Sequence, residues 1–262
     1  MSIWDHLREL RYRVTISAFA VVVAGLASIF FYRTLVGIVM APWLSAQSAL
    51  KAARPDANLM VVNNGVTSSF TFAVVLCVVA GILMATPVWV YQLWAFIAPG
   101  LLAKEKKYAL AFIGAATPLF LAGCALGYYV WPKGIQVLLS FTPADMGITN
   151  LQDMAAFLKM EIQIILVFGL SFLLPVVVVA LNQFGLVRGY QLKRWRKGVI
   201  FGSVVLAAVA TPTTDPFSML ALAVPVTSMF IIAEYICRFR DKRRGISEET
   251  AAEFAVDLED GQ

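Results

Sequence analysis

Residues 14–32 read VTISAFAVVVAGLASIFFY, a run of 19 residues without a charged side chain. A helix that crosses the hydrocarbon core of a bilayer needs roughly 20 predominantly apolar residues. The stretch therefore predicts a membrane-spanning helix. It is longer than the apolar region of a usual signal peptide and further apolar runs follow it, so we expect it to be retained as a first span.

The rest of the chain has the same character. Hydrophobic residues make up 60% of its 262 residues and charged residues 14%, and the mean hydropathy is +0.78. A water-soluble domain of this composition would expose too much apolar surface. We predict an all-α integral membrane protein with one domain over residues 1–240 and a mobile, acidic cytoplasmic tail over residues 241–262. Six spans are expected, at about residues 14–32, 70–91, 108–131, 160–183, 198–213 and 217–237.

The fifth and sixth predicted helices are short. Residues 198–213 would cover about 24 Å as a helix, against a hydrocarbon core of about 30 Å. The turn TPTTDP at residues 211–216 is therefore expected below the membrane surface. We expect Asp215 to bind backbone amides at the start of the sixth helix, primarily as a structural residue. A single re-entrant hairpin is the alternative for this pair.

Basic residues predict the orientation. With six spans and a cytoplasmic N-terminus, sixteen of the 21 Lys and Arg residues fall on the cytoplasmic side and five on the outer side. An excess of Lys and Arg in short loops marks the cytoplasmic side. Both termini are therefore predicted to be cytoplasmic. The net charge of +5 reflects this topology and does not indicate nucleic-acid binding.

Two long outer loops are expected, at residues 33–69 and 132–158. The first is fairly apolar with helical spacing, which predicts short amphipathic helices along the outer surface, kinked at Pro42. Together the two loops could cap the outer face.

Little catalytic equipment is present. The chain has one histidine, His6, and neither a phosphate-binding GxxxxGK[ST] loop nor a GxSxG nucleophile motif nor a His and Cys metal cluster. We predict no catalytic residue, metal site or cofactor, and therefore no enzyme. A receptor for a cationic ligand is favoured. The alternative is a secondary transporter or channel for a small solute, for which Glu161 and Glu234 are isolated candidates near span ends.

Glu9 is one of two acidic residues that stand among the bases of the predicted inner face. It lies in WDHLRELRYR at residues 4–13, an amphipathic extension of the first helix. Asp5, Glu9 and Arg13 follow one another at a spacing of four residues. Glu9 could bind a ligand, or it could form an ordinary helix-surface pair with Arg13.

Glu105 is the second acidic residue. It follows an aromatic loop in which Trp94 and Phe96 suit the membrane interface and Pro99 marks a break before the third span. Glu105 could receive a ligand cation, or it could offset neighbouring lysines such as Lys106.

These stretches resemble the TatC family, the polytopic receptor subunit of the twin-arginine protein translocase. The resemblance extends from about residue 4 to residue 240, and its YQxWAFIAP motif is highly specific. The matching motifs are HLxELRxR at residues 6–13, AP at 41–42, YQxWAFIAP at 91–99 with Glu105, FGxSFxxP at 168–175, TP at 211–212 and DPF at 215–217.

The resemblance implies a concave, glove-like bundle in the cell inner (plasma) membrane. Its implied function is to bind the Arg-Arg signal peptides of folded precursors at the cytoplasmic face and to nucleate their proton-motive-force-driven export. The implied partners are single-span subunits of the TatA and TatB types, membrane lipid and further copies of the chain. The residues to which it assigns roles are Glu9 and Glu105 as receivers of the arginine pair, Arg11, Trp94, Phe96 and Lys106 beside them, and Pro42, Pro87, Pro99 and Asp215 as structural or transport residues.

Two positions depart from the family pattern. Many members carry a glutamate in the fourth span where this chain has Leu173, and a family glutamine corresponds to Met219. Glu161 does not simply replace the missing glutamate. Twelve residues at about 100° each place Glu161 about 120° around the helix from Leu173 and more than three turns away.

Overall fold

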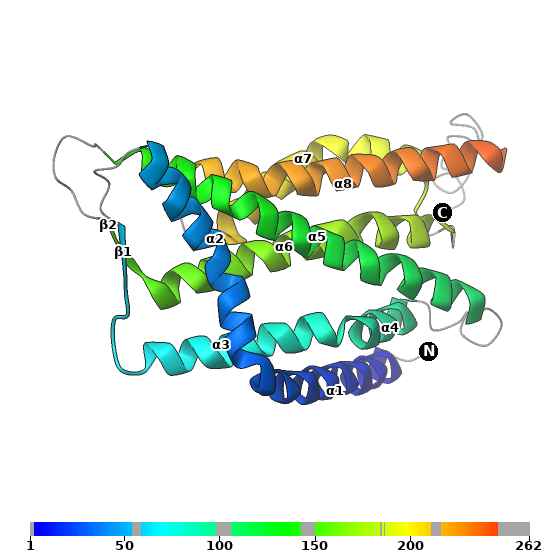
Figure 1. Ribbon diagram of the computed structural model, residues 1–262. Coiled ribbons are helices and arrows are strands. Elements are labelled where there is room, and N and C mark those ends of the chain that lie inside the picture. Colours follow the sequence, from blue (N-terminus) through cyan, green and yellow to red (C-terminus); the bar gives the residue numbers. More distant parts are fainter. Residues whose placement is uncertain are drawn as a thin grey trace. The chain divides into compact units, whose positions relative to one another are not determined.

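The structure is a computed structural model of the chain, and it describes residues 3–53, 59–97, 106–142, 150–183, 185, 187–210 and 216–245. The chain divides into two compact units, Met1–Gly169 and Leu170–Gln262, and each is described by itself. The elements, in chain order, are α1 (Ile3–Ser28), the 3₁₀ turn η1 (Ile29–Phe31), α2 (Tyr32–Ala53), β1 (Leu59–Val62), α3 (Ser68–Met84), α4 (Thr86–Ile97), α5 (Lys106–Ser140), β2 (Asn150–Asp153), α6 (Met154–Gln183), α7 (Gly189–Ala210) and α8 (Pro216–Arg243) (Figure 1).

Several of these helices are long and apolar enough to cross a membrane. In the described part of the chain they are Trp4–Ala52, Phe112–Ser140, Met154–Gln183 and Leu222–Arg243. The bent pair Ser68–Met84 and Thr86–Phe96 would make a fifth span. The protein is therefore a polytopic helical membrane protein with four or five candidate spans, while the count of six stays a prediction. The predicted tail lies outside the described residues from residue 246 onward.

The helical prediction needs one small correction, because β1 and β2 form a two-stranded parallel sheet. Leu59 lies opposite Asn150, and Val62 lies opposite Asp153. Both strands fall in the two expected outer loops, of which the first was predicted to carry short helices. The strands of a parallel pair are not joined by a tight turn. The sequence around each short strand therefore gave no sign of its partner, which lies far away in the chain.

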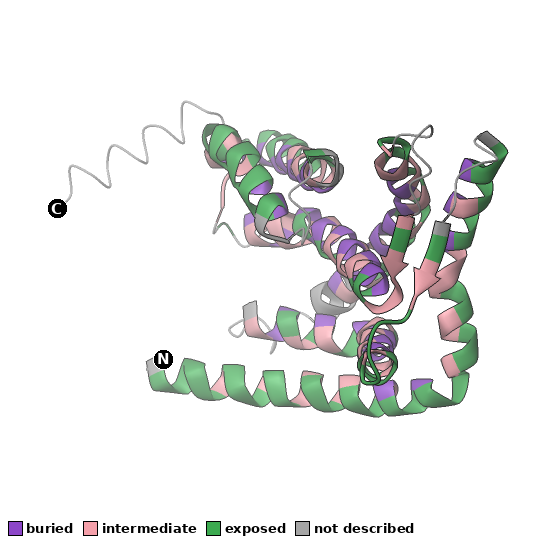
Figure 2. Cartoon of the chain, turned by 90° about the vertical axis from the view of Figure 1, so that its left-hand side faces the viewer, coloured by how far each residue is buried: buried purple, intermediate pink, exposed green. Residues whose placement is uncertain are grey.

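In the first unit, α1 is exposed along much of its length, as Figure 2 shows for the helix that begins at the N label, and many of its exposed side chains are large and apolar. Phe19 is 69% exposed and Phe30, in η1, is 89% exposed. A lipid-facing helix can leave such side chains uncovered, since lipid tails are as apolar as they are. The exposure therefore agrees with a membrane location for this helix.

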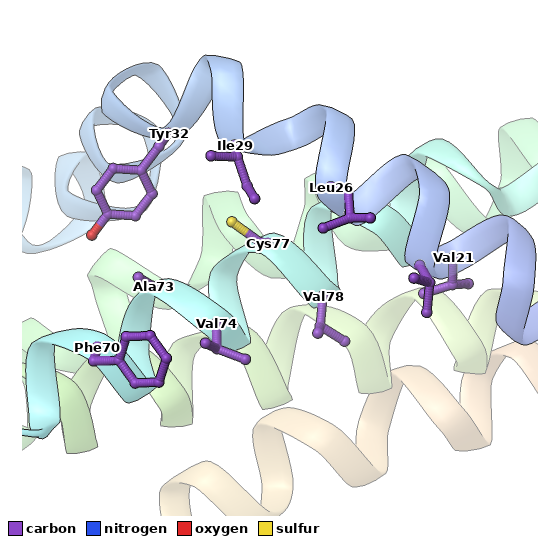
Figure 3. A pocket seen from close by; sticks show the side chains of 11 residues that line it. Val21, Leu26, Ile29, Tyr32, Phe70, Ala73, Val74, Cys77 and Val78 are labelled. Atoms are coloured by element: carbon purple, nitrogen blue, oxygen red, sulfur yellow. The ribbon is translucent and has the colours of Figure 1, made fainter.

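The helices α1 and α3 approach one another closely at two glycines. A Cβ atom on Gly81 would lie 2.8 Å from the backbone nitrogen of Gly25, and a Cβ on Gly25 would lie 3.1 Å from the Cys77 carbonyl oxygen. Ser28 Oγ also donates a hydrogen bond of 2.6 Å to the Gly25 carbonyl. Beside this contact the two helices form an apolar pocket, in which Leu26 and Val78 are among the lining side chains (Figure 3). Small residues thus allow the two backbones to meet.

The span expected at residues 70–91 is broken, and its two halves, α3 and α4, are bent by 64°. Pro87 lacks an N–H group and cannot donate to the carbonyl of Leu83 four residues earlier. It is tolerated in the first turn of α4. Side chains supply the missing donors, because Thr86 Oγ1 donates to the Leu83 carbonyl at 2.7 Å and Trp89 Nε1 donates to the Ile82 carbonyl at 3.0 Å.

Two other prolines do not end their helices. In place of the short helices expected in the first outer loop, residues 32–53 form one 22-residue helix, α2, with Pro42 inside it. The kink at Pro42 stays a prediction. Pro42 cannot donate to the Ile38 carbonyl, and the Tyr128 hydroxyl donates to that carbonyl at 2.8 Å instead. Likewise α5 continues through Pro132 to Ser140, where a loop was expected to begin. Neighbouring helices satisfy the backbone groups that such prolines release.

The second unit is held together by polar contacts around a small apolar core. Ser203 on α7 and Thr227 on α8 share a hydrogen bond of 2.7 Å. Near the other end of this pair, Asp241 Oδ2 accepts a bond of 2.7 Å from the Gly189 backbone N–H, and Asp241 Oδ1 accepts one of 3.0 Å from Asn182 Nδ2. Asp241 therefore ties the start of α7 and the end of α6 to α8. The core residues are Leu192, Phe230 and Cys237.

Candidate functional site

Glu9 lies on α1 and is partly exposed, and its carboxylate is bonded to Arg13 one turn along the same helix. Arg13 donates to Glu9 Oε1 from Nε at 3.0 Å and from Nη2 at 2.5 Å. Arg13 Nη1 also donates to Gln92 Oε1 on α4, at 3.3 Å. Since both Arg13 contacts are made to Oε1, Oε2 of Glu9 has no hydrogen-bond partner among the described residues.

Two aromatic residues of the YQxWAFIAP motif have different surroundings. Phe96, which is half-buried, stacks on the His6 ring of α1 with 4.6 Å between the ring centroids. Trp94 is buried and stacks on Phe112 of α5 at 4.4 Å. The His6 and Arg13 contacts together hold the start of α1 against the end of α4, and Trp94 holds α4 against α5.

The exposed side of this segment carries charges of both signs. Arg11 is exposed and shares a surface hollow with Glu9 and Asp5. The described residues that line the hollow are Asp5, Arg8, Glu9, Arg11, Tyr12 and Thr15. Carboxylates in a partly solvated hollow can accept hydrogen bonds from a cationic ligand. The basic side chains beside them repel the ligand from other positions, which favours binding at the carboxylates.

Several predicted site residues cannot be placed. Glu105, Pro99 and Asp215 lie outside the described residues, and Lys106 is described only as the first residue of α5. The joint site of Glu9 and Glu105 therefore stays a prediction. Gln92, by contrast, is a contact that sequence reasoning missed. Its motif was noted, but no local spacing linked it to Arg13, which is 79 residues away.

Of the two membrane glutamates considered for solute transport, Glu234 is not isolated. It is fully buried, and Arg196 of α7 donates to it twice, from Nε to Oε2 at 2.9 Å and from Nη2 to Oε1 at 3.0 Å. Arg238 Nη1 lies 3.7 Å from Oε1. The pairing was hidden because Arg196 was counted only as a base of the inner loop. Within the described residues there is also no cluster of three His, Cys, Asp or Glu side chains that could hold a metal ion.

The family model described as Sec-independent protein translocase protein (TatC) matches residues 5–225. The chain belongs to the TatC family. It is 34% identical over 268 residues to the Sec-independent protein translocase protein TatC of Frankia casuarinae, covering 100% of this chain and 72% of that protein. The protein of the same description from Escherichia coli is 30% identical over 235 residues, covering 89% of this chain and 87% of its own length.

A solved structure agrees with this membership. The crystal structure of a twin arginine translocase receptor, TatC, superposes with a TM-score of 0.75 at 25% identity, covering 89% of this chain and 98% of the receptor. The chain is thus a multi-pass membrane protein, the receptor subunit of a twin-arginine translocase, and not an enzyme. Of the two classes that the sequence left open, this membership favours the receptor over a small-solute transporter.

Proposed function

We propose that the chain binds the paired arginines of twin-arginine signal peptides through Glu9 and Glu105, at the cytoplasmic face of the plasma membrane. Binding would nucleate the proton-motive-force-driven export of the folded precursor. The observation that carries the proposal is Glu9 itself. It belongs to the segment that Arg13 and His6 hold against the YQxWAFIAP motif of a TatC-family chain.

The chemistry of Glu9 suits an arginine. A guanidinium forks onto a carboxylate through two parallel hydrogen bonds, whereas the ammonium of lysine is a point charge. Arg13 occupies Oε1 from its own helix. An incoming arginine would therefore bind the other oxygen, Oε2. Alternatively, it would displace Arg13 from Oε1, and Arg13 would then keep its bond to Gln92.

The charged hydrogen bonds and the apolar contacts would contribute different shares of the free energy of signal-peptide binding. Well-made charged hydrogen bonds contribute about 1.5–3 kcal/mol, and exposed ion pairs about 0–1 kcal/mol. A micromolar complex needs about 8 kcal/mol. Two glutamates would thus select for arginine, and the apolar part of the signal would supply much of the remaining affinity along the helices.

The wider assembly is part of the same proposal. The distribution of Lys and Arg supports six spans with both termini in the cytoplasm. TatA- and TatB-type subunits, membrane lipid and further copies of the chain would contact the apolar helix faces. Pro42, Pro87, Pro99 and Asp215 would serve the structure or transport.

The experiment compares peptides with Arg-Arg and Lys-Lys pairs on the full-length protein. Glu9→Gln and Glu105→Gln should each weaken Arg-Arg binding by about 10- to 150-fold, since 1.5–3 kcal/mol is lost. The same substitutions should weaken binding of the Lys-Lys peptide far less. Asp5→Asn is the matched control, because it removes the same charge one turn away in the same hollow. Equal losses for both peptides would show that the glutamates do not recognise arginine.

A further inference from the structure

Glu161 is a fully buried carboxyl group without a hydrogen-bond partner. It lies seven residues after the start of α6, about 10 Å along the helix. Its exposed fraction is 0%, and neither Oε1 nor Oε2 is hydrogen-bonded within the described residues. Glu234 is equally buried, but it is bonded to Arg196.

The surroundings of Glu161 are apolar or uncharged. Phe157, Leu158 and Ile162, its neighbours on α6, are buried. The indole of Trp131 on α5 is close enough to interact, yet its Nε1 is also buried and unpartnered among the described residues. A carboxyl group and an N–H donor therefore lie side by side without a well-formed bond.

No charge balances this carboxyl group in the described part of the chain. The titratable group that faces it is Tyr128 of α5, whose hydroxyl donates to the Ile38 carbonyl of α2. Lys159 lies two residues away on α6 but is exposed. Its angular separation from Glu161 along a helix is about 200°, so it points to the other side.

Burial without a partner determines the protonation state of a carboxyl group. An isolated carboxylate away from water is so costly that the group takes up a proton instead. As a carboxylic acid it has an O–H donor and keeps acceptor capacity for the Trp131 N–H group. Ionisable residues inside a membrane domain are expensive, and they mark functional sites by default.

We propose that Glu161 is a proton-binding site in the first unit of the protein. The folded protein holds the carboxyl group neutral. Release of the proton to water leaves a carboxylate that must draw water or a cation between α5 and α6. These helices are in contact here, since a Cβ atom on Gly127 would lie 3.2 Å from the Ile165 Cα. Proton loss therefore loosens this packing.

Infrared spectroscopy of the full-length protein in lipid vesicles tests the protonation state. Exposed Asp and Glu side chains have ordinary pKa values of about 3.9–4.3, so they are ionised at neutral pH. The wild type should show the carbonyl band of a protonated carboxylic acid, shifted in D₂O. Glu161→Gln should remove this band, whereas Glu234→Gln, the control that removes an ion-paired buried carboxylate, should keep it. Absence of the band in wild type, or its persistence in Glu161→Gln, would overturn the proposal.

Stability against pH tests the coupling to packing. The folded protein holds a proton that the unfolded chain, with the ordinary glutamate pKa of about 4.3, releases. Stability should therefore fall as pH rises above about 5 and should stop falling once Glu161 ionises. For one proton, the folding equilibrium constant should fall by about tenfold per pH unit until Glu161 ionises. Glu234→Gln should retain this dependence, and Glu161→Gln should lose it. The same slope in Glu161→Gln as in wild type would contradict the coupling, whatever the outcome for signal-peptide binding.

Discussion

Two helix pairs of this protein are held together in opposite ways. The helices α1 and α3 meet at Gly25 and Gly81, where the backbones are close enough to exclude a Cβ atom. The helices α7 and α8 meet through an ion pair between Arg196 and Glu234 and a hydroxyl pair. The first contact depends on the absence of side chains, and the second depends on particular side chains being present.

The difference shows which kind of change each pair can tolerate. Helices in lipid gain little from the hydrophobic effect and associate through close packing and interhelical hydrogen bonds. The glycine contact should therefore be sensitive to added volume. The polar contact should be sensitive to loss of one partner, since the other is left buried without compensation.

The largest effect is expected when buried Glu234 loses Arg196, its partly exposed ion-pair partner. Arg196→Ala leaves Glu234 buried, and Arg238, at 3.7 Å, is then the cation that remains beside it among the described residues. Leaving a buried charge without its partner costs about 3–5 kcal/mol, and the 40% exposure of the Arg196 side chain places the expected loss at the lower end of this range. Equilibrium unfolding of the full-length protein in detergent should show this loss.

The control replaces both members of the pair. Arg196→Met combined with Glu234→Leu should recover most of the stability, because apolar replacement of a whole buried pair is often neutral. If Arg196→Ala changes stability by less than the double variant does, the ion pair does not hold α7 to α8.

A smaller but clear effect is expected at the glycine contact. Gly81→Ala places a methyl group 2.8 Å from the Gly25 backbone nitrogen, so α1 and α3 must separate. Overpacking of this kind costs about 1–3 kcal/mol. Gly114→Ala is the matched control, because no described atom outside the local backbone of α5 lies within 4 Å of its would-be Cβ and alanine favours a helix. Equal stability of the two variants would show that the close approach is unimportant.

The sequence predicted the helical membrane class because length and apolar composition alone decide it. It did not predict the break between α3 and α4, or the continuation of α2 through Pro42. Those outcomes depend on which donors reach the freed carbonyls, such as Tyr128 at Ile38. Residue 128 is 90 positions from residue 38, and no local pattern connects them.

The candidate site was also predictable only in part: contacts within one helix followed from the sequence, and contacts between helices did not. The Glu9 and Arg13 pair follows from helical spacing. The stacking of His6 on Phe96 and the bond from Arg13 to Gln92 depend on how α1 lies against α4. Glu234 could not be distinguished from Glu161 by sequence, because each is one acid in an apolar helix. Only the three-dimensional neighbours give one of them a partner.

The smallest effect is expected at the hydroxyl pair of α7 and α8. Ser203 has one hydroxyl proton, and its Oγ lies 2.8 Å from the Ile200 carbonyl as well as 2.7 Å from Thr227 Oγ1. If Ser203 donates to its own helix, Thr227 must donate across to Ser203. Interhelical bonds of this kind average about 0.6 kcal/mol in double-mutant cycles. A cycle of Ser203→Ala and Thr227→Val should give a coupling energy near that value. Ser228→Ala, which removes a bond within α8 only, should show no coupling to Ser203→Ala. A coupling of several kcal/mol between Ser203 and Thr227 would mean that the hydroxyl pair, rather than the ion pair, dominates the polar contact.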